Sequence, residues 1–147
     1  MNKKGSLLAK PGAGTQPKWR DVKIKSAPKL GSVYWCQFND AEHVWLPEMW
    51  KQRPVIIVGH RDLVVRGSCL AVPTSTDPQE TNTWRMELPV YISAQIDGRN
   101  SWILCNHLVT ISTSRLSQIN GKVPRLKQED TNLLITRIRA WLPSPRA

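Results

Sequence analysis

Short apolar runs separated by polar turns fill the middle of the chain and predict a series of β-strands. The clearest run lies within Pro54–His60, where the β-branched residues Val55 to Val58 stand between a proline and a glycine, a pattern typical of a buried strand. Four further segments contain comparable apolar runs: Ser32–Phe38, Ser68–Thr74, Trp84–Ile92 and Trp102–Ile111. Pro89 indicates an edge or a bulge in the third of these, and the last predicts one long or two short strands.

The spacing of the apolar residues changes from Lys127 onward. The large side chains then recur at helical intervals, at Leu133, Leu134, Ile138, Trp141 and Leu142, and Pro143 stops the run. This spacing predicts a C-terminal amphipathic helix of about four turns. Several short strands followed by one helix predict a mainly β fold with a C-terminal helix (α+β), in which the helix caps a small, strongly curved sheet or barrel.

Residues 1–30 differ from the rest of the chain in composition. They contain three prolines and three glycines but few large apolar residues, which is typical of a disordered arm. Eight of these residues are basic and one is acidic, so the arm carries +7 of the total charge of +10. The arm is either a solubilising extension or a segment that attracts RNA or DNA. Residues 31–147 then form the folded domain.

The overall composition fits one domain with a tail in a chain of 147 residues. The sequence has no run of 18 apolar residues and no apolar stretch near its start long enough for a secretory signal, so we expect a cytoplasmic protein without membrane contact. Three cysteines lie inside apolar runs and predict buried, reduced thiols. Because there is no Cys-x-x-Cys pair, we do not expect a zinc site, and we assign neither another metal nor a cofactor.

A polar residue stands at one end of each of two apolar runs. Arg53 precedes the run Pro54–His60, and Ser75 follows the run Ser68–Thr74, with a turn expected around Arg61, Asp62 and Gly67 between the runs. If the two strands pair antiparallel, Arg53 and Ser75 come together. A guanidinium beside a hydroxyl on rigid strand ends is suited to binding a phosphate, which agrees with the polyanionic partner that the net charge indicates.

Four segments of the chain carry a longer pattern. They are Gly31–Trp35, Arg53–Val58, Cys69–Thr76 and Ile103–Ile111, the last followed by Arg115 and Leu116. In this order and with these gaps, they resemble the PemK/MazF family of toxin endoribonucleases from bacterial toxin–antitoxin modules. The resemblance covers residues 31 to about 142 and leaves the basic arm outside.

The resemblance implies an SH3-like curved barrel of the CcdB/PemK/MazF type, usually a homodimer, that cuts single-stranded RNA without a metal. In this family the 2′-hydroxyl of the substrate attacks the adjacent phosphorus, which gives a 2′,3′-cyclic phosphate and a free 5′-hydroxyl. Such a reaction needs a base, an acid and positive charge near the phosphorane. The implied partners are RNA and a cognate antitoxin whose acidic, disordered segment lies across the RNA groove, and the implied outcome is inhibition of growth.

The resemblance also assigns roles to individual residues. Arg53 matches the catalytic arginine and Ser75 matches the catalytic hydroxyl, with Thr74 and Thr76 as neighbours that could substitute for it. Glu48 matches an acidic loop residue of some members, so it is either a base, a group that orients Arg53, or a solvated carboxylate.

Residues around Glu48 are candidates for contacting RNA. Trp45 and Trp50 flank this carboxylate, and Lys51 follows them. Both indole rings are either base-stacking platforms or buried beneath the loop.

The long apolar segment departs from the family pattern. Leu104 and Asn106 stand where some members have Arg and Asp, and Val109 stands where many members have Arg. Asn106 can contact RNA but cannot serve as a base. His107 can transfer protons near neutral pH and is a second candidate for RNA contact. Because successive strand residues face opposite sides, however, we expect His107 in the core or at an interface.

These departures keep two other classes of function open. The first is a non-enzymatic toxin on the same fold, such as a gyrase poison, in which Trp141 and Leu142 at the end of the helix make the contact. The second is a plain RNA- or DNA-binding protein in which the basic arm does most of the binding.

Overall fold

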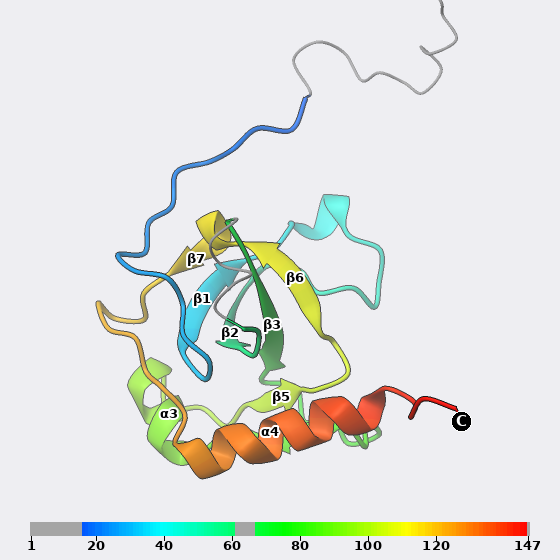
Figure 1. Cartoon of the computed structure of the whole chain (residues 1–147). Coiled ribbons are helices and arrows are strands. Elements are labelled where there is room, and N and C mark those ends of the chain that lie inside the picture. Colours follow the sequence, from blue (N-terminus) through cyan, green and yellow to red (C-terminus); the bar gives the residue numbers. More distant parts are fainter. Residues whose placement is uncertain (1–15, 61–66, 147) are drawn as a thin grey trace, which may run out of the picture.

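Antiparallel pairing joins seven strands into one strongly bent sheet in the computed structural model, which describes residues 16–60 and 67–146 (Figure 1). The strands are β1 (Val33–Gln37), β2 (Gln52–Ile57), β3 (Ser68–Ser75), β4 (Arg85–Glu87), β5 (Trp102–Leu104), β6 (Val109–Ser112) and β7 (Leu116–Ser117). The helices are α3 (Val90–Ile96) and α4 (Gln128–Trp141), with short 3-10 turns η2 (Ala41–His43) and η3 (Thr113–Arg115).

Strand β3 bends the sheet, because different parts of its length pair with different neighbours. Its first half pairs with β6, its middle with β2, and its last two residues with β5. The order of the sheet is β4-β5-β3-β2-β1-β7, with β6 alongside β3. The predicted mainly β, curved fold with a C-terminal helix is therefore confirmed. Among the described residues, the end strands β4 and β7 do not pair with each other, so the barrel is open.

Two predicted boundaries are corrected by the structure. The strand predicted over Trp84–Ile92 ends at Glu87, and the residues after Pro89 form helix α3. Proline has no N–H to give to a strand ladder, and its fixed φ suits a helix start. The second strand starts at Gln52 and ends at Ile57, so Val58–His60 lie beyond it.

Other predicted elements are confirmed. The segment Trp102–Ile111 forms two short strands, β5 and β6, and the C-terminal helix spans 14 residues before Pro143. The predicted turn at Arg61 and Asp62 falls outside the described residues, as do the first 15 residues of the predicted arm; residues 16–30 contain no helix or strand. In the described ranges, no helix is both long and apolar enough to cross a membrane.

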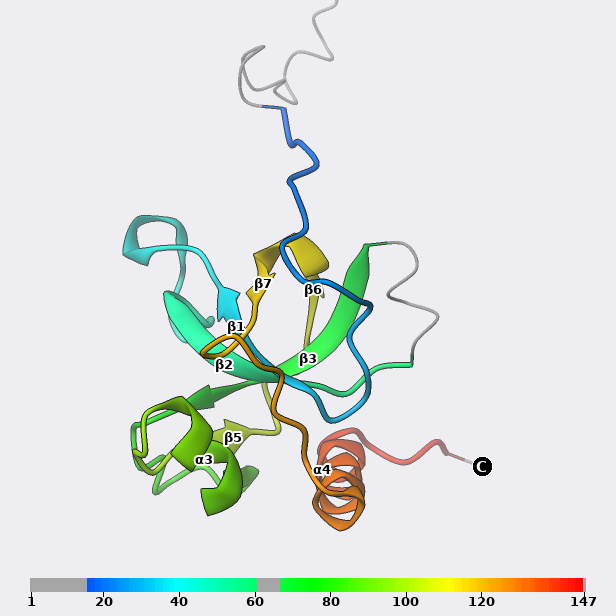
Figure 2. The same ribbon diagram turned by 90° about the vertical axis from the view of Figure 1, so that its left-hand side faces the viewer.

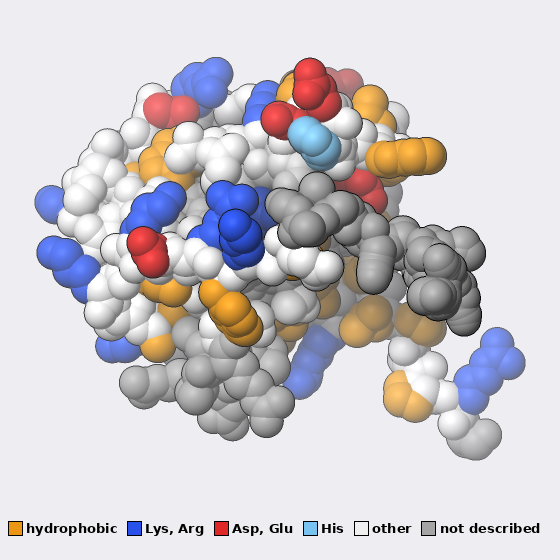
Figure 3. Space-filling view, turned by 90° about the horizontal axis from the view of Figure 1, so that it is seen from above, with side chains coloured by type: hydrophobic (Ala, Val, Ile, Leu, Met, Phe, Trp, Pro, Cys, Tyr) orange, Lys and Arg blue, Asp and Glu red, His pale blue; other side chains and the backbone are white. Residues whose placement is uncertain are grey.

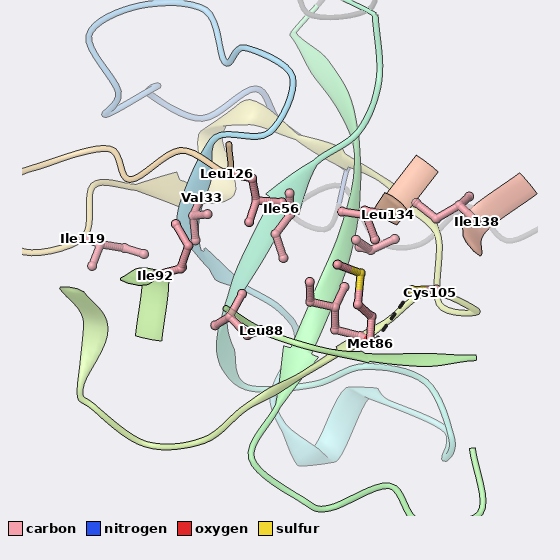
Figure 4. Packing of buried hydrophobic residues seen from close by; sticks show 12 residues of the cluster. Val33, Ile56, Met86, Leu88, Ile92, Cys105, Ile119, Leu126, Leu134 and Ile138 are labelled. Atoms are coloured by element: carbon pink, nitrogen blue, oxygen red, sulfur yellow. Dashed lines mark hydrogen bonds between the residues drawn. The ribbon is translucent and has the colours of Figure 1, made fainter. Parts of the chain in front are cut away.

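The main core lies between the bent sheet and the two helices (Figures 2 and 4). Side chains from β1, β2 and β3 meet those of α3 and α4 there. The largest fully buried members of this core are Ile56, Leu88, Ile92, Ile103, Ile119 and Leu134. A second cluster, built on Tyr34, Val55 and Ile57, contains the alternate side chains of β1 and β2. This alternation follows from the two-residue period of a strand.

Gly31 lies just before β1 and packs closely against helix α4. Its φ of +85° lies in the left-handed region, and a Cβ there would lie 2.9 Å from the Oγ1 of Thr131. A side chain at this position would therefore be strained and would crowd the Thr131 side chain in the first turn of α4.

The three cysteines are reduced and buried, as predicted. Burial raises the pKa of the Cys36 thiol to about 12 and those of Cys69 and Cys105 to about 11. Because the thiolate is the reactive form, we expect a disulfide reagent at about pH 8 to modify the native protein slowly and all three thiols promptly after unfolding in guanidinium. Prompt reaction of the native protein would contradict this burial.

Candidate active site

Strand pairing brings Arg53 and Ser75 together. The pairing of β2 with β3 ends with Val55 opposite Pro73, so Arg53 and Ser75 each lie two residues beyond the last pair, at the same end of the two strands. Both residues line one cavity of about 200 Å³. The loop Leu46–Trp50 provides a second side of this cavity, and the remaining wall consists of Asp77, Gln79, Leu104 and His107.

The Arg53 side chain is held by backbone carbonyl groups of the loop before β2 and of β3. Its Nε donates to the carbonyl oxygen of Trp50 at 2.9 Å, and its Nη1 donates to that of Thr74 at 3.2 Å. Burial lowers the pKa of Arg53, and the nearby carboxylate of Asp77 partly opposes this shift. The guanidinium remains charged, and within the described part of the chain three of its five N–H groups have no protein partner. Arg53 is therefore a fixed cation with donors left for a ligand.

Ser75 offers a hydroxyl donor at the same place. It is almost buried, with 8% of its surface exposed, and its Oγ accepts a hydrogen bond of 3.1 Å from the N–H of Asp77. This contact uses a lone pair of the oxygen and leaves the hydroxyl hydrogen available. The neighbouring threonines differ. Thr74 is buried and donates to the carbonyl oxygen of Pro54 at 2.9 Å, whereas Thr76 is exposed, and neither lines the cavity.

Glu48 lines the cavity from the loop between β1 and β2. Its Oε1 accepts from the N–H of Trp45 at 2.9 Å, and its own N–H donates to the carbonyl oxygen of Trp45 at the same distance. These two bonds close the loop, which projects away from α4 in Figures 1 and 2. The Glu48 carboxylate is exposed and keeps a second oxygen free.

The two tryptophans of the loop have different environments. Trp45 is 83% exposed and does not line the cavity, whereas Trp50 is half-buried and does. The Nζ of Lys51 lies 5.3 Å from the centre of the Trp50 ring, an exposed cation–π contact. Trp50 and Lys51 therefore lie beside the cavity, and Trp45 lies outside it.

The turn after β5 places His107 in the cavity wall. Strand β5 ends at Leu104, and the N–H of His107 donates to the Leu104 carbonyl oxygen at 2.9 Å. Asn106 and His107 therefore lie beyond the strand, and the rule that successive strand residues face opposite sides does not apply to them. His107 is half-buried in the wall and belongs to neither core cluster, so it does not take the core position, while the alternative of an interface stays a prediction. Asn106 lies away from the cavity, and its Oδ1 accepts from the Nδ2 of Asn82 at 3.1 Å.

Sequence reasoning missed Asp77 and Gln79. Both line the cavity, and Asp77 binds Ser75 through its N–H and acts on Arg53 through its charge. The dipeptide Asp77–Pro78 signals a turn, but only the pairing of β2 with β3 shows that this turn closes the site.

A separate face carries groups of the kind that bind metals. The ligand atoms of Asp40, Glu42 and His43 lie within 4.8 Å of one another around η2, and all three residues are exposed. Figure 3 views this face, where a histidine lies among acidic side chains and basic side chains gather nearby. A wide groove there, of about 1140 Å³, is lined by basic residues of the arm and by Arg115. None of the three metal-binding candidates lines the cavity of Arg53.

The comparison with protein families gives the decisive observation. A family model of "PemK-like, MazF-like toxin of type II toxin-antitoxin system" matches residues 29–142. The chain belongs to the PemK/MazF toxin family. The match covers every strand described above, the whole of α4 and the whole candidate site of this PemK/MazF toxin. No curated protein sequence matches the chain.

Solved structures show that this PemK/MazF toxin has the MazF fold. The crystal structure of MazF (Form-I) from Deinococcus radiodurans matches with a TM-score of 0.62 and 15% identity, covering 79% of this chain and 96% of that one. The MazE-MazF complex (Form-III) from the same organism matches with a TM-score of 0.59 and 14% identity, covering 78% and 95%. An endoribonuclease in complex with its cognate antitoxin from Mycobacterial species has a TM-score of 0.56 and 19% identity, covering 81% and 100%.

Proposed function

We propose that this PemK/MazF toxin is a sequence-selective endoribonuclease that cuts single-stranded RNA in the cytoplasm without a metal. The observation that carries this proposal is the cavity where Arg53 and Ser75 meet, because it combines a fixed cation with a hydroxyl donor. Membership of the family agrees with it, and one structural relative is described as an endoribonuclease. RNA cleavage would account for growth inhibition by the toxin.

The cavity fits the transesterification that the family performs. The 2′-oxygen of the substrate attacks the adjacent phosphorus, and negative charge gathers on the equatorial oxygens of the phosphorane. The remaining N–H groups of Arg53 stabilise that charge, and the Ser75 hydroxyl donates to a non-bridging oxygen. Glu48 lies near enough to line the cavity, either as a base or as the residue that closes the loop over the RNA.

We further propose an antitoxin partner and, because the chain belongs to a family whose members are usually homodimers, a homodimer. Two of the structural relatives are complexes with an antitoxin, which supports a partner of the same kind here. The net charge of +10 suits an antitoxin segment that is acidic and disordered, and such a segment competes with RNA for the same cationic surface.

A cleavage assay tests the enzymatic function. Purified protein is incubated with a long RNA in EDTA, and the new ends are analysed. We expect 2′,3′-cyclic phosphates and free 5′-hydroxyls. Replacing Ser75 by Ala should slow the reaction by about 10- to 100-fold, the effect of losing one hydrogen bond to a charged group. The exposed Ser144 gives a matched control, since Ser144→Ala should cut at the wild-type rate. Absence of cyclic ends from the wild type would contradict the proposal.

A gyrase-poison-like toxin is the second candidate, favoured by one observation. Trp141 is 42% exposed and Leu142 is 55% exposed at the end of α4. The Trp141 ring packs edge-on against the Trp84 ring, with the two ring centres 5.6 Å apart. Such apolar side chains could bind a protein target. If this class were right, the Arg53→Ala variant would still inhibit growth fully, whereas a variant lacking residues 139–147 would no longer inhibit growth.

A further inference from the structure

His107 is a titratable group in the cavity for which the family pattern gives no role. It lines the wall together with Arg53 and Ser75, and the hydrogen bond from its N–H to the Leu104 carbonyl oxygen fixes the turn that carries it. Within the described residues, no side chain or backbone group makes a hydrogen bond to its ring. Both ring nitrogens are therefore available to a ligand.

We propose that His107 is the general base that takes the proton from the attacking 2′-hydroxyl, an inference that rests on the ribonuclease function proposed above. The other candidates in this part of the chain are less suited. Leu104 is apolar, the Asn106 amide is not basic and bonds Asn82 outside the cavity, and one oxygen of Glu48 is committed to the loop. Asp77 also lines the cavity, but its charge acts on Arg53 and its N–H is bonded to Ser75. The His107 imidazole has no hydrogen-bond partner among the described residues, so it is the better candidate for the base.

The surroundings of His107 keep its ring neutral. Burial lowers the pKa of His107, and the positive charge of Arg53 lowers it further. Three charged groups line the cavity around it: Arg53 from β2, Asp77 from the segment after β3, and Glu48 from the loop before β2. The imidazole therefore has a free lone pair at neutral pH, as a base requires.

The step balances without a metal or a redox partner. The proton of the 2′-hydroxyl moves to a ring nitrogen of His107 while the bond from O2′ to phosphorus forms. The bond from phosphorus to O5′ breaks, and O5′ leaves with the electron pair, stabilised by Arg53. O5′ then takes a proton from water, and the imidazolium returns its proton to solvent. The net change is a transesterification, in agreement with a cyclic phosphate product.

Substitution of His107 with pH profiles gives the first test. The cleavage rate of the wild type should fall at acidic pH as His107 gains its proton, with a midpoint below the ordinary histidine value of 6.5. His107→Gln should cut about 10²- to 10³-fold more slowly at neutral pH and lose this acidic limb. Glu48→Gln is the matched control and should keep it. Loss of the limb in Glu48→Gln, with His107→Gln unaffected, would overturn the assignment in favour of Glu48.

Chemical rescue separates a base from a structural role. Added imidazole should restore part of the activity of His107→Ala but none of that of Arg53→Ala, and His107→Asn serves if the alanine variant does not fold. A substrate with sulfur in place of O5′ at the mapped cleavage site, which needs no acid for its leaving group, should not restore the His107 variants. If the His107 variants cut this sulfur substrate at the wild-type rate, His107 would be the acid that protonates the leaving group and not the base. Equal rates for wild type and His107→Gln overturn this inference alone, whereas a wild type that does not cut overturns the ribonuclease function and this inference together.

Discussion

Replacing Arg53 by Ala is expected to slow RNA cleavage by about 10²- to 10³-fold, the effect of removing one preorganised group that stabilises transition-state charge. The guanidinium is fixed by bonds to the carbonyl oxygens of Trp50 and Thr74, so it needs no reorganisation as the phosphorane forms. The measurement is the single-turnover rate on an RNA with one mapped cleavage site, in the presence of EDTA.

Two further variants make the result specific to the guanidinium. Arg53→Lys keeps the charge but loses the planar fork, so it should recover only a small part of the rate. Arg139→Ala removes an exposed arginine from α4 and should cut like the wild type. Circular dichroism and the melting temperature show whether each variant is folded. Undiminished cutting by folded Arg53→Ala would remove the cavity from the mechanism.

Leu134→Ala should lower the free energy of unfolding by about 3 kcal/mol, because truncating a fully buried leucine removes apolar contacts and leaves a cavity in the core. Leu134 projects from α4 into the main core, where it joins Ile56 of β2 and Ile103 of β5. Figure 4 shows its side chain among the others of this cluster. Urea unfolding followed by tryptophan fluorescence measures the change.

The adjacent residue of the same helix provides the control. Leu133 is 47% exposed, so Leu133→Ala should cost about 0.5 kcal/mol or less. Equal losses for the two variants would show that α4 does not pack on the sheet through the face described here. The comparison matters for function because α4 packs on the sheet that contains β3 and β5. Ser75 ends β3, and the turn that carries His107 follows β5.

The sequence allowed the cavity to be predicted where strand pairing determines it. Arg53 and Ser75 stand at the ends of two apolar runs, and antiparallel pairing of adjacent strands brings such ends together without further information. The C-terminal helix followed equally directly from the helical spacing before Pro143. These features depend on local period and on the pairing of neighbouring strands, both of which are visible in a single sequence.

Features that depend on loop paths could not be predicted in the same way. Pro89 was compatible with a strand edge and with a helix start, and only the packing of Ile92 in the core decides for α3. His107 was placed by strand alternation, which fails because β5 stops at Leu104. Asp77 enters the site through its loop conformation and its bond to Ser75, for which no periodic signal exists.

A single-atom change in the substrate tests the central claim most directly. The RNA is cut by the wild type, the cleavage site is mapped, and the nucleotide whose 2′-hydroxyl would attack is replaced by its 2′-deoxy form in an otherwise identical strand. The account predicts that cleavage at this site stops while binding of the strand persists, because the nucleophile is gone and the phosphate contacts of Arg53 and Ser75 remain. Cleavage of the deoxy strand at the same position and rate would contradict the account.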